Sequence, residues 1–233
     1  MLTIKNVVIQ RDTFELSANF TVPDGVTKLA MVGPSGAGKS TLLGAIGGFV
    51  PLDQGRISWE GRDLTEMPPV ARPMSHLFQD NNLFPHMTAA QNVGLGIAPN
   101  LKLSPQDWER VENALAAVGI GGMGGKRPAQ LSGGQQSRVA LARILVQRQP
   151  IVLLDEPFSA LGPAMRVEMT ALASKVGTGL GATMLMVSHD LADARRFADY
   201  VIWVDTGTAH APQSWEELEA EPPAGYRAYV GDG

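Results

Sequence analysis

The amino-acid sequence predicts an α/β fold, and three stretches of the chain support this prediction. The apolar run at 29–32 has the character of a buried strand, and a second apolar run at 151–154 resembles it. Residues 14–22 alternate apolar and polar side chains, as a half-buried strand does. Beyond a glycine-rich turn, the residues after the first run suit one face of a helix: Leu42, Leu43 and Ile46. At 233 residues the chain can bury a substantial core, so we expect one α/β domain over residues 1–233 with a helical subdomain.

A phosphate-binding loop lies between the first strand and its helix. Residues 33–41 read Gly-Pro-Ser-Gly-Ala-Gly-Lys-Ser-Thr, which satisfies the P-loop pattern with Lys39 and Ser40 in the last places. The glycines let successive N–H groups face a phosphate at the positive end of the following helix dipole. Lys39 is expected to reach the β- and γ-phosphates, and the Ser40 hydroxyl to ligate Mg²⁺. The sequence therefore predicts that a nucleoside triphosphate is bound by Gly33, Pro34, Ser35, Gly36, Ala37, Gly38, Lys39, Ser40 and Thr41.

Two adjacent acids follow the second buried strand, in the run Ile-Val-Leu-Leu-Asp-Glu-Pro at 151–157. Asp155 is placed to hold Mg²⁺, and Glu156 to orient and deprotonate an attacking water. Without a cation the two carboxylates would repel each other, which favours a metal site over a surface pair. The loop and the acid pair therefore support each other.

A second glycine-rich helix start lies at 131–135, which reads Leu-Ser-Gly-Gly-Gln. Ser132 can cap a helix whose first-turn N–H groups and dipole offer another phosphate-binding end. One P-loop does not need a second anion site in the same subunit. We therefore expect two copies of the chain to sandwich each nucleotide head to tail, with these residues supplied by the other copy: Ser132, Gly133, Gly134 and Gln135.

With these motifs the chain resembles the ATP-binding subunits of ABC transporters, from residue 1 to about residue 210. The resemblance implies a P-loop NTPase fold with a RecA-like core, an antiparallel β subdomain, a helical subdomain at about 80–148 and a short tail at about 210–233. It implies an ATPase that needs ATP and Mg²⁺ and forms a homodimer on ATP. Gln79 resembles the glutamine that touches Mg²⁺ and water, and His189 the switch histidine that contacts the γ-phosphate. Without the other motifs, both would be ordinary polar residues.

The chain departs from the family pattern at two places. Gly162 stands where the family usually has an aspartate after the acid pair, which puts in doubt the usual hydrogen bonding across the dimer. The family often stacks an aromatic ring on adenine, and here Arg11 lies near that position with Phe14 as the nearest aromatic residue. The alternation along 14–22 favours a core role for Phe14, and the guanidinium of Arg11 could stack on the base instead.

Composition agrees with a compact subunit, so we expect the membrane association that the resemblance implies to come through a partner. A net charge of −4 gives no basic field for nucleic acid, so no nucleic-acid partner is expected. The chain has no cysteine, no signal-like N-terminus and no apolar run near the roughly 20 residues that span a bilayer. We expect a peripheral protein on the cytoplasmic face of the inner membrane. Residues after about 210 are expected to form a short helix and a loose tail.

The segment 79–101 is informative about what is transported. Together with Gly47-Gly48-Phe49 and with Pro68-Pro69 before Arg72-Pro73, it resembles the ATPase subunits of bacterial thiamine importers. The sequence thus predicts the ATP-hydrolysing subunit of an importer of thiamine or its phosphates, working with permease subunits and, indirectly, a periplasmic or extracellular solute-binding protein. Iron, sulfate and polyamine importers share parts of the segment and stay open. A soluble ABC ATPase acting on DNA or ribosomes fits less well, since the chain has no room for a second ATPase domain or a coiled-coil insertion. Three apolar residues could line a docking groove for a permease helix or could equally pack inside: Leu83, Phe84 and Met87.

Overall fold

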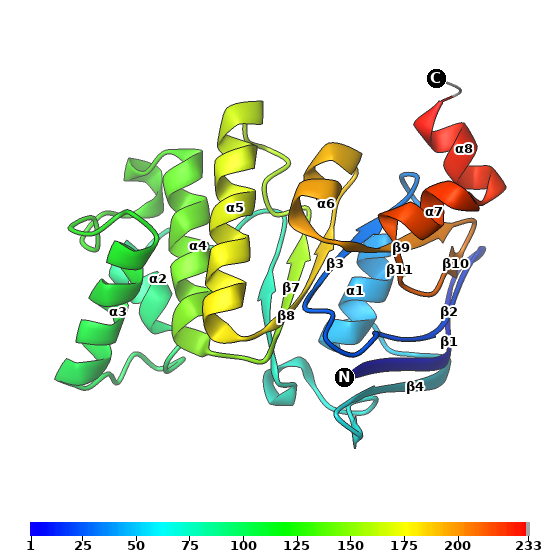
Figure 1. Cartoon of the computed structure of the whole chain (residues 1–233). Coiled ribbons are helices and arrows are strands. Elements are labelled where there is room, and N and C mark those ends of the chain that lie inside the picture. Colours follow the sequence, from blue (N-terminus) through cyan, green and yellow to red (C-terminus); the bar gives the residue numbers. More distant parts are fainter. Residues whose placement is uncertain (232–233) are drawn as a thin grey trace. The chain divides into compact units, whose positions relative to one another are not determined.

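The computed structural model describes residues 1–231, and the α/β fold predicted from the sequence is confirmed. The chain forms two compact units. The first contains Met1–Pro73 and the chain from Met184 onward, and the second contains Met74–Thr183. Both units combine strands with helices, as Figure 1 shows along the colour gradient of the chain.

The sheet of the first unit joins an antiparallel part to a parallel part. Its strands follow the order β5-β4-β1-β2-β10-β9-β3-β8, and β11 also pairs with β9. The pairs β1–β2 and β1–β4 are antiparallel, whereas β3 lies parallel to both β8 and β9. The strand bounds are β1 Leu2–Arg11, β2 Phe14–Thr21, β3 Lys28–Val32, β4 Gln54–Trp59, β5 Arg62–Asp63, β8 Thr183–Val187, β9 Tyr200–Asp205, β10 Thr208–Ala209 and β11 Gln213–Ser214.

The helices of the first unit include the one predicted after the phosphate loop. They are α1 Lys39–Gly47, the 3-10 turn η1 Pro69–Ala71, α6 Leu191–Phe197, α7 Trp215–Ala220 and α8 Ala224–Val230. The predicted apolar face of α1 is fully buried, because Leu42, Leu43 and Ile46 have no exposed surface. The strands beside it are buried as well, including the whole of β3 apart from Lys28. This part of the core therefore holds the phosphate loop between a buried strand and a buried helix face.

The segment after residue 210 corrects one expectation. In place of a single short helix and a loose tail, it contains β11, α7 and α8. Helix α8 packs through Tyr226, which is buried and meets the ring of Trp203 edge to face at 5.3 Å. Sequence patterns could not show this contact, because Trp203 lies in β9, a distant strand. Residues 232 and 233 of the predicted tail lie outside the described residues.

The second unit packs four helices beside a parallel strand pair. The strands are β6 Met74–Leu77 and β7 Ile151–Asp155, and the helices are α2 Ala89–Gly94, α3 Pro105–Ala117, α4 Gly133–Gln147 and α5 Pro163–Leu180, with the 3-10 turn η2 Pro128–Gln130. Helix α4 contacts α2, α3 and α5, and Figure 1 shows α4 and α5 running side by side. The unit contains the predicted helical segment.

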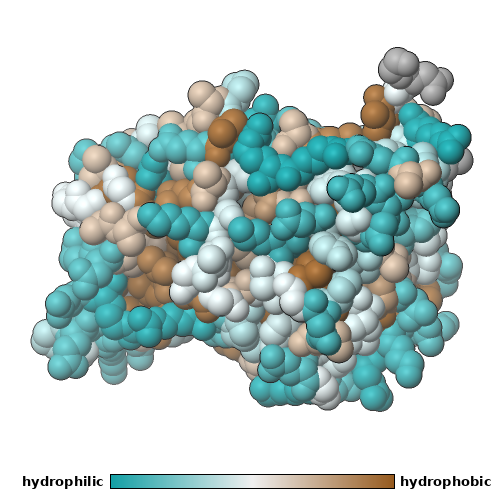
Figure 2. All heavy atoms as spheres, in the orientation of Figure 1, coloured by the Kyte–Doolittle hydropathy of each residue, from teal (hydrophilic) through white to brown (hydrophobic). Residues whose placement is uncertain are grey.

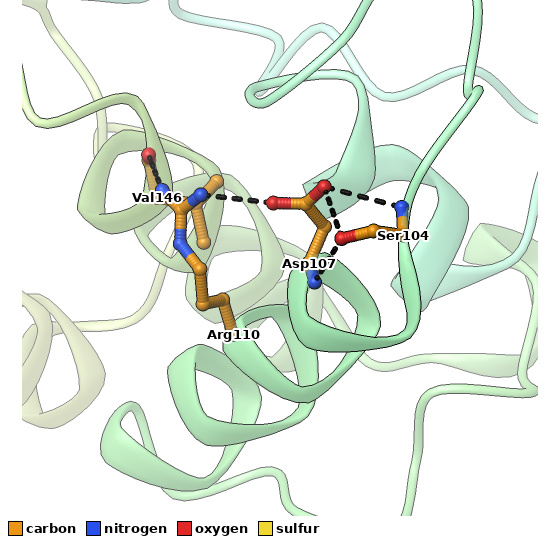
Figure 3. Close-up of polar contacts among 4 residues, drawn as sticks. All are labelled: Ser104, Asp107, Arg110 and Val146. Atoms are coloured by element: carbon orange, nitrogen blue, oxygen red, sulfur yellow. Dashed lines mark hydrogen bonds and ion pairs between the residues drawn. The ribbon is translucent and has the colours of Figure 1, made fainter.

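Helix α3 shows how local sequence sets an element and ties it to its neighbour (Figure 3). Ser104 caps it in a reciprocal box with Asp107, because the Ser104 hydroxyl accepts from the Asp107 N–H and the Asp107 carboxylate accepts from the Ser104 N–H. One turn later Arg110 donates to that same carboxylate at 3.0 Å and to the carbonyl oxygen of Val146 at 3.4 Å. Arg110 therefore links the start of α3 to the end of α4.

The surface in Figure 2 is mostly hydrophilic, with hydrophobic residues in separate patches. Among residues 1–231, no helix combines the length and the apolar character that crossing a membrane requires. Large apolar side chains that reach the surface include Phe49, Val70 and Phe84.

Candidate nucleotide site

The phosphate loop of the first unit is closed around the ammonium group of Lys39. Lys39 begins α1 and is 6% exposed. Its Nζ donates to the carbonyl oxygens of Gly33 and Pro34 at 2.7 and 2.8 Å. Gly38 occupies the N-cap position of α1 in the left-handed region, with no side-chain cap on the helix. A helix start that a glycine opens without a side-chain cap suits an anion such as a phosphate.

The glycines of this loop have different structural tasks. A Cβ at Gly33 would overlap the carbonyl oxygen of Val204 in β9. At Gly38 it would lie 2.8 Å from Cζ of Phe14, so the loop is seated against side chains of β2 as well. At Gly36, where φ is 78°, nothing lies within 4 Å of an added Cβ. The loop is thus packed against its neighbours at Gly33 and Gly38 and open at Gly36. The open centre leaves room for a bound group to approach the backbone closely.

The loop that carries His189 follows a neighbouring strand of the same unit. Strands β3 and β8 are parallel, so the phosphate loop and His189 both leave from carboxyl ends of adjacent strands, where α/β sheets bind ligands. The Ser188 N–H donates to the carbonyl oxygen of Met31 at 3.1 Å, and Asp190 caps α6 by accepting from the N–H groups of Ala192 and Asp193. His189 itself is exposed. The structure therefore brings the predicted lysine and histidine to one edge of one sheet.

The acid pair of the second unit ends β7 as predicted. Asp155 is the last residue of the strand, and both acids are half-buried. Glu156 has a φ of 43°, in the left-handed region that side chains other than glycine rarely adopt. Its carbonyl oxygen accepts from the N–H and the hydroxyl of Ser159 at 3.3 and 3.1 Å, which closes the turn. Strain of this kind gathers at functional sites, where the surrounding structure enforces it.

Gln79 follows β6, the strand that pairs with β7 in the same unit. Strands β6 and β7 are parallel with Leu77 opposite Leu154, so Gln79 and Glu156 both stand two residues beyond that pair. Gln79 is exposed in the turn that follows β6. The turn after it is held by Arg143 of α4, whose guanidinium donates to the carbonyl oxygens of Asn81 and Asn82, at 3.0 Å each. Burial lowers the pKa of Arg143, yet it stays a cation at neutral pH.

The next loop is held by a buried amide, Asn92 of α2. Its side chain accepts from the Phe84 N–H at 2.8 Å and donates to the carbonyl oxygens of Phe84, Met87 and Thr88. Phe84 is 43% exposed on this loop, whereas Leu83 and Met87 are half-buried. Sequence reasoning missed both Asn92 and Arg143 as supports. The only available signal was a polar residue within an otherwise apolar helix face.

The predicted cap at Ser132 is present at the start of α4. The Ser132 hydroxyl accepts from the Gln135 N–H at 3.3 Å, and the Gln135 side chain accepts from the Ser132 N–H at 3.0 Å. Ser132 and Gly133 are exposed, whereas Gly134 is buried, and a Cβ there would lie 2.9 Å from the Met165 sulfur. The N–H groups of Gly133 and Gly134 fall in the first turn, where a helix offers no acceptor. An anion of another subunit could use them.

The residues fit Mg²⁺ as a nucleotide-bound ion better than as a resident one. Among residues 1–231 no three His, Cys, Asp or Glu side chains gather into a metal cluster. Mg²⁺ in nucleotide sites usually takes one or two protein ligands and completes its shell with phosphates and water. The predicted ligands are oxygen donors of that kind: the Ser40 hydroxyl in the first unit, and the Gln79 amide and the Asp155 carboxylate in the second. Their roles, like those of the other predicted site residues, stay predictions.

A P-loop that opens a helix, together with an acid pair that ends a buried strand, defines a P-loop nucleoside triphosphatase. The family model described as ABC transporter matches residues 17–159. The chain belongs to the ABC transporter family and is one of its ATP-binding, ATP-hydrolysing subunits. The sequence-based resemblance is thereby confirmed.

Two curated relatives are similar to this chain over almost its whole length. The thiamine import ATP-binding protein ThiQ of Ruegeria sp. (strain TM1040) is 52% identical over 231 residues, which cover 99% of this chain and 100% of the relative. The protein of that name from Cereibacter sphaeroides is also 52% identical with the same coverage. Among solved structures, the dimeric post-hydrolysis state of the ATP-binding cassette MJ0796 bound to ADP and Pi has a TM-score of 0.78 and 28% identity, and the match covers 92% of this chain and 98% of that one.

Proposed function

We propose that this chain is the ATP-hydrolysing subunit of an importer of thiamine or its phosphates. The observation that carries the proposal is 52% identity along the whole chain to thiamine import ATP-binding proteins. The sequence of the segment 79–101 had already favoured the same substrate over iron, sulfate and polyamines. The ATP site binds only the nucleotide, so another part of the importer recognises the transported solute.

In the proposed cycle, the phosphate loop and Lys39 hold the nucleotide phosphates through N–H groups and one ammonium group. Ser40, Gln79 and Asp155 would hold Mg²⁺, which when bound would supply positive charge to the phosphate oxygens. Glu156 orients the attacking water and accepts its proton, and His189 contacts the γ-phosphate. The strained backbone at Glu156 supports its part in this scheme, because strain of this kind persists mainly at functional sites. Positioning and charge stabilisation supply most of the rate.

The chain is proposed to act as a homodimer that closes on ATP, with residues 132–135 of each copy completing the site of the other. The dimeric state of the related cassette supports this arrangement. We propose further that the dimer docks on permease subunits at the cytoplasmic face of the inner membrane and works indirectly with a solute-binding protein outside. The exposed ring of Phe84, on a loop braced by Asn92, is a suitable permease contact.

The test replaces the natural gene in its own host by the parent chain, by Glu156→Gln or by Glu109→Gln. Glu109 is an exposed residue of α3 and serves as the matched control. Protein levels are equalised, and uptake of labelled thiamine is measured together with ATP turnover of the purified chains. We expect Glu156→Gln to lower turnover by about 10²- to 10⁴-fold, while ATP binding changes far less.

Loss of uptake with Glu156→Gln and normal uptake with Glu109→Gln would support the proposal. If the purified parent hydrolyses ATP while thiamine uptake is the same in all strains, including a strain lacking the gene, thiamine is the wrong substrate. The same strains would then be supplied with labelled iron, sulfate and polyamines. If Glu156→Gln hydrolyses ATP at the parent rate, the assignment of the base is wrong.

A further inference from the structure

The C-terminal helix α8 is hydrogen-bonded to the loop that carries His189. The Tyr229 hydroxyl donates to the carbonyl oxygen of His189 at 2.8 Å. The acceptor is the backbone carbonyl of His189 itself, so the bond restrains the backbone that carries the imidazole. Sequence reasoning missed this residue, because Tyr229 and His189 are 40 positions apart.

The residues on either side of His189 are held independently. The Ser188 N–H donates to Met31 of β3, and the Ser188 hydroxyl donates to the carbonyl oxygen of Asp190 at 3.0 Å. The Asp190 carboxylate is used to cap α6. These bonds hold the two ends of the loop, and the Tyr229 hydroxyl bonds to the His189 carbonyl between them.

Helix α8 has a defined seat from which Tyr229 can act. The ring of Trp203, fully buried in β9, meets Tyr226 edge to face at 5.3 Å and Tyr229 at 5.4 Å with the planes tilted by 60°. The Tyr226 hydroxyl accepts from Arg195 of α6 at 3.3 Å. A Cβ at Gly225 would overlap the Asp205 carboxylate, so the start of α8 lies against the end of β9. Both aromatic contacts and close backbone packing therefore set the place of the hydroxyl.

We propose that Tyr229 is a positioning residue that orients the backbone of His189 toward the γ-phosphate of bound ATP. This inference rests on the proposed role of His189. Tyr229 acts through the histidine and does not touch the nucleotide. The seat of α8 is tied to the phosphate loop as well, because Trp203 stands opposite Val32, the residue before Gly33.

The test is a double-mutant cycle on the purified full-length chain with Tyr229→Phe and His189→Ala, alone and combined. Phenylalanine keeps the ring on Trp203 and removes only the hydroxyl. Tyr226→Phe is the matched control, since it removes a hydroxyl from the same helix that bonds to Arg195 instead. For each variant, kcat and KM for ATP are measured together with the midpoint of thermal unfolding.

We expect Tyr229→Phe to lower kcat by about 3- to 10-fold, the effect of one hydrogen bond, with KM within about twofold of the parent. Tyr226→Phe should leave kcat within about twofold while shifting the unfolding midpoint at least as much. In the His189→Ala background, Tyr229→Phe should change the residual turnover by less than about twofold, because the bond has nothing left to position.

Equal kcat values for Tyr229→Phe and Tyr226→Phe would overturn the inference, as would an undiminished effect of Tyr229→Phe in the His189→Ala background. In both cases a loss of turnover in His189→Ala would leave the proposed role of His189 standing. If His189→Ala turns over ATP like the parent, that role fails, and the inference fails with it.

Discussion

Replacing Arg72 by methionine should destabilise the first unit strongly, because this buried cation is bonded to backbone carbonyls on two sides. Arg72 is 5% exposed. Its guanidinium donates to Ala45 and Ile46 at the end of α1, at 2.8 and 2.7 Å. It also donates to Thr65 and Met67 in the segment before η1, at 3.0 and 2.9 Å. Arg72 therefore fastens the C-terminal end of the phosphate-loop helix, where a cation also opposes the negative end of the helix dipole.

The magnitude follows from these bonds. Burial lowers the pKa of Arg72, which means that folding pays a desolvation cost for the charge. Against that cost, each of the four bonds contributes a net of about 1 kcal/mol. Methionine removes the guanidinium donor from all four carbonyl oxygens, and the Ala45 carbonyl keeps the bond that it accepts from the Gly48 N–H at 3.1 Å. We expect Arg72→Met to lower the free energy of unfolding by about 3–5 kcal/mol. Arg72→Lys should lose about half as much, since one ammonium cannot reproduce the planar fork.

The assay is urea unfolding of the full chain without nucleotide, followed by circular dichroism. The matched control is Arg56→Met, because the Arg56 side chain is 68% exposed and pairs with Asp63 at the surface. We expect this control to cost less than about 1 kcal/mol. A cost for Arg72→Met no greater than that of Arg56→Met would refute the reasoning, since it would mean that water replaces the guanidinium at no loss.

Three further predictions concern other named residues. Burial lowers the pKa of His76 to about 4 from 6.5, so between these pH values the unfolded chain binds a proton that the fold excludes. The free energy of unfolding should therefore fall by up to about 3 kcal/mol as pH drops through this window. His76→Phe, which keeps the stacking on Phe78, should flatten the pH dependence of the urea midpoint, and an unchanged pH dependence would contradict this. Asn92→Leu should cost about 3–4 kcal/mol in urea unfolding, because it removes four side-chain hydrogen bonds to the backbone of the loop at 84–88. A loss under about 1 kcal/mol would argue against that support. Gly162→Asp should raise the unfolding midpoint by about 1 °C, since Gly162 is the N-cap of α5 without a side-chain cap and nothing lies within 4 Å of an added Cβ. A lower midpoint in calorimetry would show that the position resists a side chain.

The sequence allowed prediction of those parts of the site that depend on neighbours within a few positions. The P-loop glycines, the acid pair at the end of β7 and the Ser132 cap all follow from residues within one turn of each other. Local sequence also predicts the alternation of β2, whose Phe14 is half-buried beside Gly38. Structure that is set by residues at such short spacing depends little on how the rest of the chain folds.

The supports of the site could not be predicted, because their partners are distant in the sequence. Arg143 bonds carbonyl groups about 60 positions earlier, and Trp203 receives a helix that starts at Ala224. The sequence around α8 is rich in Pro, Glu and Ala and resembles a tail until the tyrosine rings meet Trp203. Composition reports the average character of a segment, whereas two aromatic contacts decide whether it folds.

In the first unit, Lys39 and His189 share one edge of one sheet, but different parts of the chain hold them in place. Lys39 is gripped within its own loop by the carbonyl groups of Gly33 and Pro34, so its position depends on the glycine backbone. The carbonyl of His189 is instead held by a hydroxyl from the C-terminal helix. A change at Tyr229 should therefore affect the loop that carries His189 and leave the hydrogen bonds of Lys39 unchanged. Trp203 contacts α8 and also stands opposite Val32, which precedes the phosphate loop. A substitution of Trp203 is therefore expected to affect both the loop that carries His189 and the phosphate loop that holds Lys39.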